Sequence, residues 1–316
     1  MNREKTIIKK DIKMEKIKEI KEIKEMGKVL RGKPVAQDLL DHAAKEAGAL
    51  GERGIRPLLA IVRVGEKEAD LRYEKNAVKT AEKAGVIVRK VILEESISQE
   101  DLDQALQSLN EDPLVHGILL LRPLPSPLDG ERARKLLSPQ KDVDGTTDGS
   151  LAGVFTGSGE GFSPCTAQAA MEILRFYGID PRGKNAVIIG RSLVVGRPLS
   201  MMLLSANATP TLCHTKTRDL PEICRGADIL VAASGQGEAY GKEFVHPGQI
   251  VLDVGINFNE KTGKITGDMK YEEVLPRVKA ITPVPGGVGA VTTAVLISHV
   301  VTAATRQAEK DEGGRP

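Results

Sequence analysis

The chain has 316 residues, of which 41% are hydrophobic and 28% charged, which is ordinary for a water-soluble protein of two domains. A net charge of +2 and an aromatic content of 3% without tryptophan argue against a nucleic-acid partner, which needs a basic surface and rings that stack on bases. The three cysteines are widely spaced and no apolar run reaches the ~18 residues of a membrane span. We therefore expect a cytoplasmic protein with reduced thiols, no metal site and no membrane partner.

Residues 1–28 form a lysine- and glutamate-rich extension in which Ile17, Ile20 and Ile23 recur at a spacing of three. The extension lacks the apolar centre of a signal peptide, and its glutamates are atypical of a transit peptide. We predict a solvated, partly helical appendage and assign it no chemistry.

The segment 29–163 is predicted to be an α/β domain that binds the substrate. Short β-branched runs predict strands, and longer amphipathic segments between them predict helices. The expected strands cover 58–64, 86–93 and 117–121, and the expected helices cover 30–51, 70–84 and 99–109. This alternation predicts a parallel sheet with helices on both faces. Residues 138–163, rich in Gly, Thr and Ser, are predicted to be a loop.

The segment 164–289 is predicted to be a Rossmann-type domain. A helix over 165–177 leads into it, and strands are expected over 186–189, 211–213, 229–233 and 250–254, while residues 280–284 lead into a glycine-dense run. In the last segment, 290–316, a helix from 290 to about 306 is apolar along much of its length. We expect that helix to pack back on the first domain.

The turn after the first Rossmann strand is the first candidate site. Gly190 ends the strand, Gly196 follows after a tight connection, and a helix-compatible run begins near residue 199. Such a turn offers backbone N–H groups and a positive helix end to a pyrophosphate. Ser192 occupies the place of the second glycine in the usual G-x-G-x-x-G fingerprint, so an ordinary α/β turn is the alternative.

The second Rossmann strand favours NADP over NAD as the cofactor. An NAD enzyme usually places an acidic residue at this strand end to bind the ribose 2′-hydroxyl. Here the strand is followed by His214, Thr215 and Lys216, and the first acid is Asp219. With Arg191 beside the first glycine, this set suits a 2′-phosphate. A basic, solvated loop is the alternative.

Three further features are candidates for a substrate site. Tyr73 shares a helix face with Asn76 and Ala77, and could stack on a flat ring. Asp144 could accept two N–H donors from an amidine-like ring edge, as in pterin binding. The glycine-dense run 285–289 would let backbone approach a ligand closely. Taken singly, a packing tyrosine and an Asp-Gly turn are the favoured explanations of the first two features, and a plain turn is the alternative for the third.

These motifs, in this order, resemble those of the bifunctional methylenetetrahydrofolate dehydrogenase/methenyltetrahydrofolate cyclohydrolase family, over 32–306. The motifs are Gly32-Lys33 with Ala36, Val64-Gly65 with Tyr73, Arg122-Pro123-Leu124-Pro125, Lys141-Asp142-Val143-Asp144-Gly145, Pro164-Cys165-Thr166, Gly190-Arg191-Ser192 with Val195-Gly196 and Pro198, Cys213-His214-Thr215, Asp253-Val254-Gly255-Ile256-Asn257 and Thr282 to Gly289.

The resemblance implies a homodimer with a tetrahydrofolate cleft between its two domains. It implies oxidation of 5,10-methylenetetrahydrofolate with NADP, then hydrolysis of the methenyl cation to 10-formyltetrahydrofolate. The implied substrate-binding residues are Tyr73, Asn76, Ala77, Leu120, Leu121, Arg122, Asp144, Pro285, Gly286, Gly287, Val288 and Gly289. The implied cofactor-binding residues are Gly190, Arg191, Ser192, Gly196, His214, Thr215 and Ile256.

Two positions depart from the pattern of the family it resembles. Ala77 stands where such proteins carry a lysine that activates water, and Leu121 where they carry a glutamine that positions it. Tyr73, Asp144 and Lys79 are the expected catalytic residues, although Lys79 lies about 120° around the helix from Tyr73. We therefore expect weakened hydrolysis. A monofunctional dehydrogenase and a non-catalytic folate or nucleotide binder remain alternatives.

Overall fold

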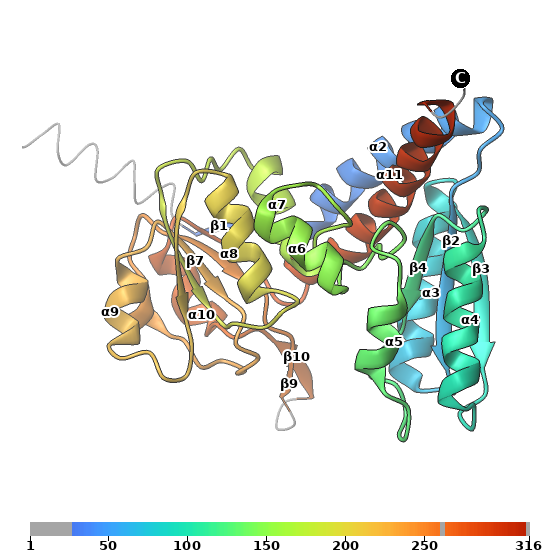
Figure 1. Ribbon diagram of the computed structural model, residues 1–316. Coiled ribbons are helices and arrows are strands. Elements are labelled where there is room, and N and C mark those ends of the chain that lie inside the picture. Colours follow the sequence, from blue (N-terminus) through green and yellow to red (C-terminus); the bar gives the residue numbers. More distant parts are fainter. Residues whose placement is uncertain (1–26, 260–262, 314–316) are drawn as a thin grey trace, which may run out of the picture.

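The computed structural model describes residues 27–259 and 263–313, which form two α/β domains joined by long helices (Figure 1). The isoleucine pattern of the extension lies outside these residues. Among the described helices, none combines the length and the apolar character needed to cross a membrane.

The first domain is a parallel sheet in the order β3-β2-β4. Its strands are β2 (Leu58–Val64), β3 (Ile87–Leu93) and β4 (Gly117–Leu120). The side chains of β2 alternate: Leu59 and Ile61 pack towards α2, α3 and α11, whereas Ala60 and Val62 pack towards α4 and α5. The covering helices are α2 (Gly32–Glu52), α3 (Glu68–Lys83), α4 (Gln99–Glu111), α5 (Gly130–Leu136) and α11 (Thr292–Gly313).

The second domain contains a six-stranded parallel sheet in the order β1-β11-β8-β7-β5-β6. Its strands are β1 (Lys28–Val29), β5 (Asn185–Ile189), β6 (Thr209–Cys213), β7 (Ile229–Ala232), β8 (Ile250–Asp253) and β11 (Ala280–Ile281). The central strands are buried on both faces, as is typical of parallel sheets. The helices α7 (Cys165–Phe176) and α8 (Gly196–Ser205) lie on one face, and α9 (Leu220–Arg225) and α10 (Tyr271–Val274) on the other. A hairpin of β9 (Asn257–Asn259) and β10 (Lys264–Thr266) follows β8.

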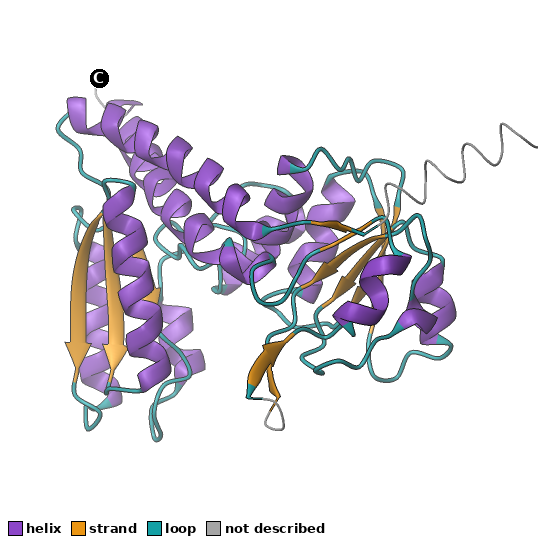
Figure 2. Cartoon of the chain, turned by 180° about the vertical axis from the view of Figure 1, so that it is seen from behind, coloured by secondary structure: helices purple, strands orange, loops and turns teal. Residues whose placement is uncertain are grey.

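The long helices α2 and α11 lie side by side between the two sheets (Figure 2). Helix α11 also contacts α3, β2 and β4, so the last helix packs back on the first domain as expected. The first residue of α2 lies so close to the loop after β11 that position 32 requires a glycine. A Cβ atom there would lie 2.1 Å from the carbonyl oxygen of Gly287.

The structure corrects the predicted loop over 138–163, because that segment contains α6 (Asp148–Thr156). Gly149 and Gly153 lower its helix propensity, which hid the helix from sequence analysis. Packing explains Gly153: a Cβ atom there would lie 2.0 Å from the carbonyl oxygen of Glu160. Thr147 caps the helix by accepting a hydrogen bond from the backbone of Ser150. Helix α5 and strand β1 were also not predicted.

Candidate active site

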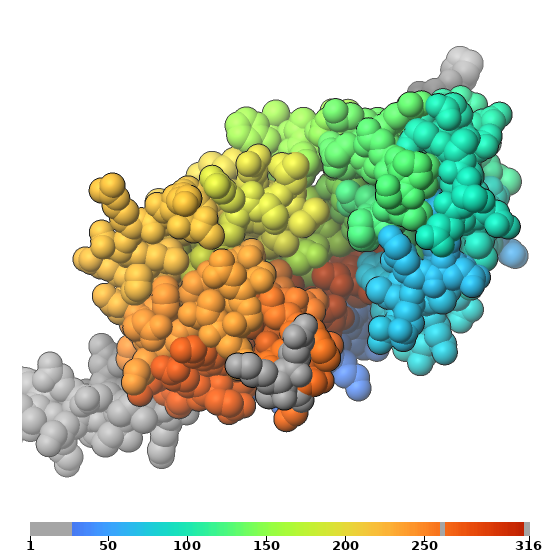
Figure 3. All heavy atoms as spheres, turned by 90° about the horizontal axis from the view of Figure 1, so that it is seen from below, coloured from blue at the N-terminus to red at the C-terminus, as the bar shows by residue number. Residues whose placement is uncertain are grey.

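A hollow lies between the two domains. Viewed from below, the surface is hollowed between α3 of the first domain and the second domain, and α11 forms the floor of the hollow (Figure 3). Parallel strands of both sheets end near it, which is the usual place for a ligand in an open α/β sheet.

Tyr73 lies on α3, half-buried against the core, and its neighbours tie this helix to α11. Burial raises the pKa of Tyr73 well above its ordinary value, and the charge of Asp144 adds to this effect, so the phenol stays protonated. The Asn76 side-chain amide donates to the hydroxyl of Thr293 at 3.1 Å, and Thr293 also lies near the phenol of Tyr73. Sequence reasoning missed Thr293, because nothing local marks a threonine in the first turn of a packed helix.

A buried ion-pair cluster fixes the part of α3 that carries Tyr73. Arg63 on β2 donates from Nε to Glu74 at 2.9 Å, and Lys90 on β3 lies 2.8 Å from the other carboxylate oxygen. The side chains of Arg63 and Glu74 are only 4% and 6% exposed. Burial alone would raise the pKa of Glu74, but hydrogen bonds from Lys90 and Arg63 outweigh it and hold that pKa below its ordinary value.

Asp144 lies beside Arg122, with 3.8 Å between the carboxylate and the guanidinium. Burial, together with the charge of Asp142, raises the pKa of Asp144 to about 6, and Arg122 opposes the shift. Asp144 is therefore mainly ionised at neutral pH. A single carboxylate at this place can accept two parallel N–H donors.

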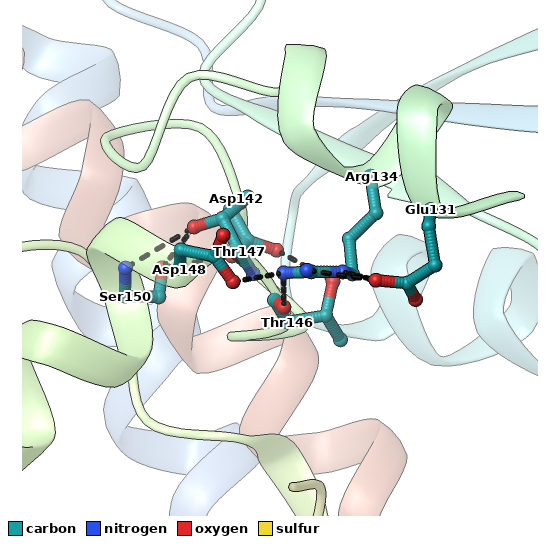
Figure 4. A network of polar contacts seen from close by, with 7 residues as sticks. All are labelled: Glu131, Arg134, Asp142, Thr146, Thr147, Asp148 and Ser150. Carbon is teal, nitrogen blue, oxygen red and sulfur yellow. Dashed lines mark hydrogen bonds and ion pairs between the residues drawn. The ribbon is translucent and has the colours of Figure 1, made fainter.

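Asp142, two residues before Asp144, is fully buried and anchors this part of the backbone by hydrogen bonds (Figure 4). Its carboxylate accepts from the backbone N–H of Thr147 and from the hydroxyl of Ser150, both at 2.7 Å. Gly145 turns the chain with φ of +70°, and a Cβ atom there would lie 2.4 Å from the backbone of Ser163.

Arg134 joins α5 to the same loop (Figure 4). It lies 2.9 Å from both Glu131 and Asp148, and it donates to the carbonyl oxygen of Thr146 at 2.8 Å. Because Arg134 is only 6% exposed, these partners compensate a charge that is largely removed from water. The network keeps the loop in one conformation.

The two positions that depart from the family pattern are apolar and buried. Ala77 is 0% exposed and Leu121 7%, and both belong to the hydrophobic core. The predicted substrate residue Leu120, next to Leu121, is 5% exposed and is also buried. Lys79 is exposed on α3. The thiol of Cys165 donates to the carbonyl oxygen of Val143 at 3.3 Å, and burial raises its pKa, so it stays protonated.

A cavity of about 400 Å³ at the ends of β5, β6 and β7 gathers most of the predicted cofactor residues, namely Gly190, Arg191, Ser192, His214 and Thr215. Its floor requires glycine. A Cβ atom at Gly190 would lie 2.1 Å from the carbonyl oxygen of Ala233, and one at Gly196 would lie 2.0 Å from that of Gly190. Ser192 replaces a glycine by turning its hydroxyl back to accept from the backbone of Val195 at 3.1 Å.

The loop after β6 closes one side of this cavity. The backbone of His214 donates to the hydroxyl of Thr217 at 2.9 Å, and the His214 ring accepts from the backbone of Lys216 at 3.1 Å. These bonds leave the side chains of Arg191 and Thr215 exposed at the cavity. A cationic and hydroxyl-bearing rim of this kind fits a phosphate group.

A second cavity, of about 290 Å³, joins Ile256 to the glycine-dense loop after β11, with Pro285, Gly286, Gly287 and Gly289 in its wall. Ile256 is 66% exposed, and a Cβ atom at Gly289 would lie 3.2 Å from its Cδ1. Val288 is 1% exposed, so its side chain belongs to the core and only its backbone can face a ligand. Within the described ranges, no cluster of three metal-ligating side chains occurs.

Comparisons with known proteins agree with this geometry. Residues 30–144 match the catalytic domain of the tetrahydrofolate dehydrogenase/cyclohydrolase family, and residues 164–308 match its NAD(P)-binding domain. The chain is 46% identical over 282 residues to bifunctional protein FolD 1 of Desulfitobacterium hafniense, covering 89% of this chain and all of that relative.

Solved structures show the same similarity. The bifunctional FolD enzyme of Campylobacter jejuni is 39% identical with a TM-score of 0.85, over 88% of this chain and 98% of that one. The Trypanosoma brucei enzyme, solved with NADP cofactor and inhibitor, is 31% identical with a TM-score of 0.81, over 89% and 98%. The chain belongs to the tetrahydrofolate dehydrogenase/cyclohydrolase family.

Proposed function

We propose that this protein oxidises 5,10-methylenetetrahydrofolate to 5,10-methenyltetrahydrofolate with NADP, and that it hydrolyses the methenyl product to 10-formyltetrahydrofolate only slowly. One observation carries the proposal. Tyr73 lies near Asp144, and two cavities are lined by predicted cofactor residues and by the loop 285–289, whereas a buried alanine and a buried leucine stand where the family carries its water-activating lysine and the glutamine that positions it.

On the folate side, Tyr73 stacks on the pterin and Asp144 accepts N–H donors from its amidine-like edge. The ionised form of Asp144 is the form that accepts both donors. Arg122 places a positive charge beside the carboxylate of Asp144. The hydrogen bond between Asn76 and Thr293 fixes the distance between α3 and α11. These groups supply orientation, which is the main requirement of hydride transfer.

On the cofactor side, NADP supplies the hydride acceptor. The glycine turn at Gly190 and Gly196 offers backbone N–H groups to the pyrophosphate. Arg191 and Thr215 bind the 2′-phosphate, and no acid stands at the end of β6 to favour the bare ribose of NAD. Ile256 packs near the loop 285–289, so the cofactor and the folate meet at the second cavity.

Hydrolysis needs a placed acid or base, which typically contributes ~10²–10⁴-fold. Ala77 and Leu121 provide none, and the guanidinium of Arg122 stays protonated. Lys79, exposed on the same helix, is the residue that we assign to residual proton transfer.

We also propose a cytoplasmic homodimer without a nucleic-acid partner. Phe155 on α6 is 73% exposed and Leu204 on the neighbouring α8 is 52% exposed, which provides an apolar surface for a second copy. Light scattering on the protein as it elutes from a size-exclusion column should give twice the mass of one chain. A monomer at micromolar concentration would contradict this assignment.

Restoring the two missing side chains tests the proposal. We expect the double variant Ala77→Lys with Leu121→Gln to hydrolyse added methenyltetrahydrofolate at least tenfold faster than the natural chain, as the aliphatic stem of the new lysine can pack in the core. Lys79→Met tests the role assigned to Lys79 and should remove the residual hydrolysis rate of the natural chain. A folded double variant with unchanged hydrolysis would contradict the assigned cause. Absence of any NADP reduction by the natural chain would favour a non-catalytic binder.

A further inference from the structure

Two buried carboxylates lie between the two cofactor cavities. Asp253 is the last residue of β8 and is 2% exposed, and Asp268 follows β10 and is 0% exposed. Asp253 also lines the second cavity. Neither residue belongs to the predicted sites, and both are too buried to be ordinary surface charges.

The carboxylate of Asp268 organises the loop after β7. One oxygen accepts from the backbone N–H of Ser234 at 2.6 Å, from its hydroxyl at 2.9 Å and from the backbone of Gly235 at 3.0 Å. The other accepts from the amide of Asn257 at 2.9 Å, in the first residue of β9. Ser234 lines the first cavity, so Asp268 connects that cavity to the hairpin.

The carboxylate of Asp253 in turn holds Asp268. Its Oδ1 accepts from the backbone N–H groups of Gly255 at 3.1 Å and Asp268 at 3.0 Å, and its Oδ2 accepts from Met269 at 2.9 Å. The two carboxylates therefore act in series, from the end of β8 through Asp268 to the loop after β7.

Glycines make this arrangement sterically possible. A Cβ atom at Gly267 would lie 1.9 Å from Oδ2 of Asp253, and one at Gly255 would lie 2.1 Å from Oδ1 of Asp268. The two carboxylates therefore lie in close contact with the backbone of these glycines. Across the residues that the structure describes, no Arg, Lys or His side chain forms an ion pair with either of them, and all their hydrogen-bond partners are donors.

We propose that Asp253 and Asp268 are positioning residues for the nicotinamide cofactor, holding the loops after β7 and β8 at the separation that the cofactor spans. The inference rests on the proposed binding of NADP in the two cavities. The charged or titratable groups that face the pair are few. The two carboxylates face one another, and Tyr240, from the segment after β7, faces Asp268.

This arrangement makes cofactor binding depend on pH. Burial raises the pKa of Asp253 to about 7, although its bonds from the Met269 and Asp268 backbones favour the ionised form. Protonation removes the negative charge of Asp253 and so weakens its charge-assisted bonds from the backbone N–H groups of Gly255, Asp268 and Met269, and the new O–H faces the carboxylate of Asp268 as its acceptor. Asp253→Asn mimics the protonated form at every pH.

The experiment measures the dissociation constant of NADPH from its own fluorescence, for the natural chain and for Asp253→Asn, at pH 8 and pH 6. Dividing the two constants at each pH removes the titration of the 2′-phosphate. At pH 8 Asp253 is about 90% ionised and at pH 6 about 10%, so the ratio should fall from at least tenfold towards one. A ratio that does not change with pH would overturn the proposal.

Asp268→Asn should also weaken NADPH at least tenfold at pH 8, while folate binding changes less than twofold. The matched control is Asp228→Asn, because Asp228 also accepts a backbone N–H, from Asn185 at 2.9 Å, but at the opposite end of the sheet. The control should leave NADPH binding unchanged. Equal losses for both ligands, or for both variants, would reduce the pair to a structural role.

If Asp268→Asn does not fold, Asn257→Ala, which removes a single bond to the same carboxylate, should still weaken NADPH severalfold, and unchanged binding would count against the proposal. A natural chain that binds no NADPH at pH 8 would instead refute the proposed function.

Discussion

The sharpest pH prediction concerns Asp144, whose pKa of about 6 lies above its ordinary value because of burial. Only the ionised carboxylate accepts both pterin donors, so activity should be lost as pH falls through 6. The ionised fraction is about 99% at pH 8 and about 9% at pH 5, so kcat/KM for the folate should fall about tenfold between them. Asp144→Asn removes hydrogen bonds to a charged group, worth about 1.5–3 kcal/mol, and should lower kcat/KM about 10- to 150-fold at pH 8.

The assay is the initial rate of NADPH formation at saturating NADP, which keeps the titration of Asp253 out of the measurement. The dependence on pH should disappear in Asp144→Asn. Glu160→Gln serves as the control, because Glu160 belongs to the same segment but its side chain is exposed and takes no part in the Asp142 and Arg134 network. A natural chain whose kcat/KM stays constant from pH 8 to pH 5, or an Asp144→Asn variant that keeps the slope, would refute the assigned role.

Three further results are expected. Glu74→Ala leaves the buried charge of Arg63 without its partner and should lower the free energy of unfolding in urea by about 3–5 kcal/mol; a loss below about 1 kcal/mol would contradict the buried cluster. Arg191→Ala should raise the KM for NADP about tenfold and leave that for NAD unchanged, since it removes a charge-assisted phosphate contact; equal effects on both cofactors would show that Arg191 does not bind the 2′-phosphate. Gly196→Ala should abolish NADPH binding because its Cβ would meet a carbonyl oxygen at 2.0 Å, whereas Gly130→Ala, with no atom within 4 Å, should bind normally.

Local patterns were sufficient for most of the strands. The β-branched run 58–64 lies between Pro57 and Gly65 and forms β2 over those same residues. The strand predicted over 186–189 begins only one residue earlier, at Asn185. In these segments propensity, burial and flanking turn residues all favour the same conformation, so a single sequence is informative.

Local patterns were insufficient where distant segments decide. Helix α6 contains glycines whose value is set by the chain packed against them. The Asn76 and Thr293 side chains meet across 217 positions, and Ser234 and Asp268 across 34. A hydrophobic period of 3.6 or 2 residues specifies which face of a helix or strand is buried. It does not specify which polar group of a distant segment forms a hydrogen bond with that element.

The resemblance implies one cleft with Tyr73, Asp144 and the two glycine-rich loops. In the structure Tyr73 lies near Asp144, and the two glycine-rich loops line two separate cavities. Their chemical roles stay predictions. The consequences of Ala77 and Leu121 are also predictions, because a buried apolar side chain shows that a proton-transferring group is missing but not how much rate is lost.

One time course tests the central claim most directly. Purified protein is mixed with 5,10-methylenetetrahydrofolate and NADP at neutral pH, NADPH is followed by its own fluorescence, and methenyltetrahydrofolate is followed by the absorbance that remains after the NADPH contribution is subtracted. No acid quench is used, because acid closes 10-formyltetrahydrofolate back to the methenyl cation. The account predicts that NADPH forms and that methenyltetrahydrofolate accumulates with it and persists. Methenyltetrahydrofolate that is consumed as fast as NADPH forms would contradict the weakened hydrolysis assigned to Ala77 and Leu121.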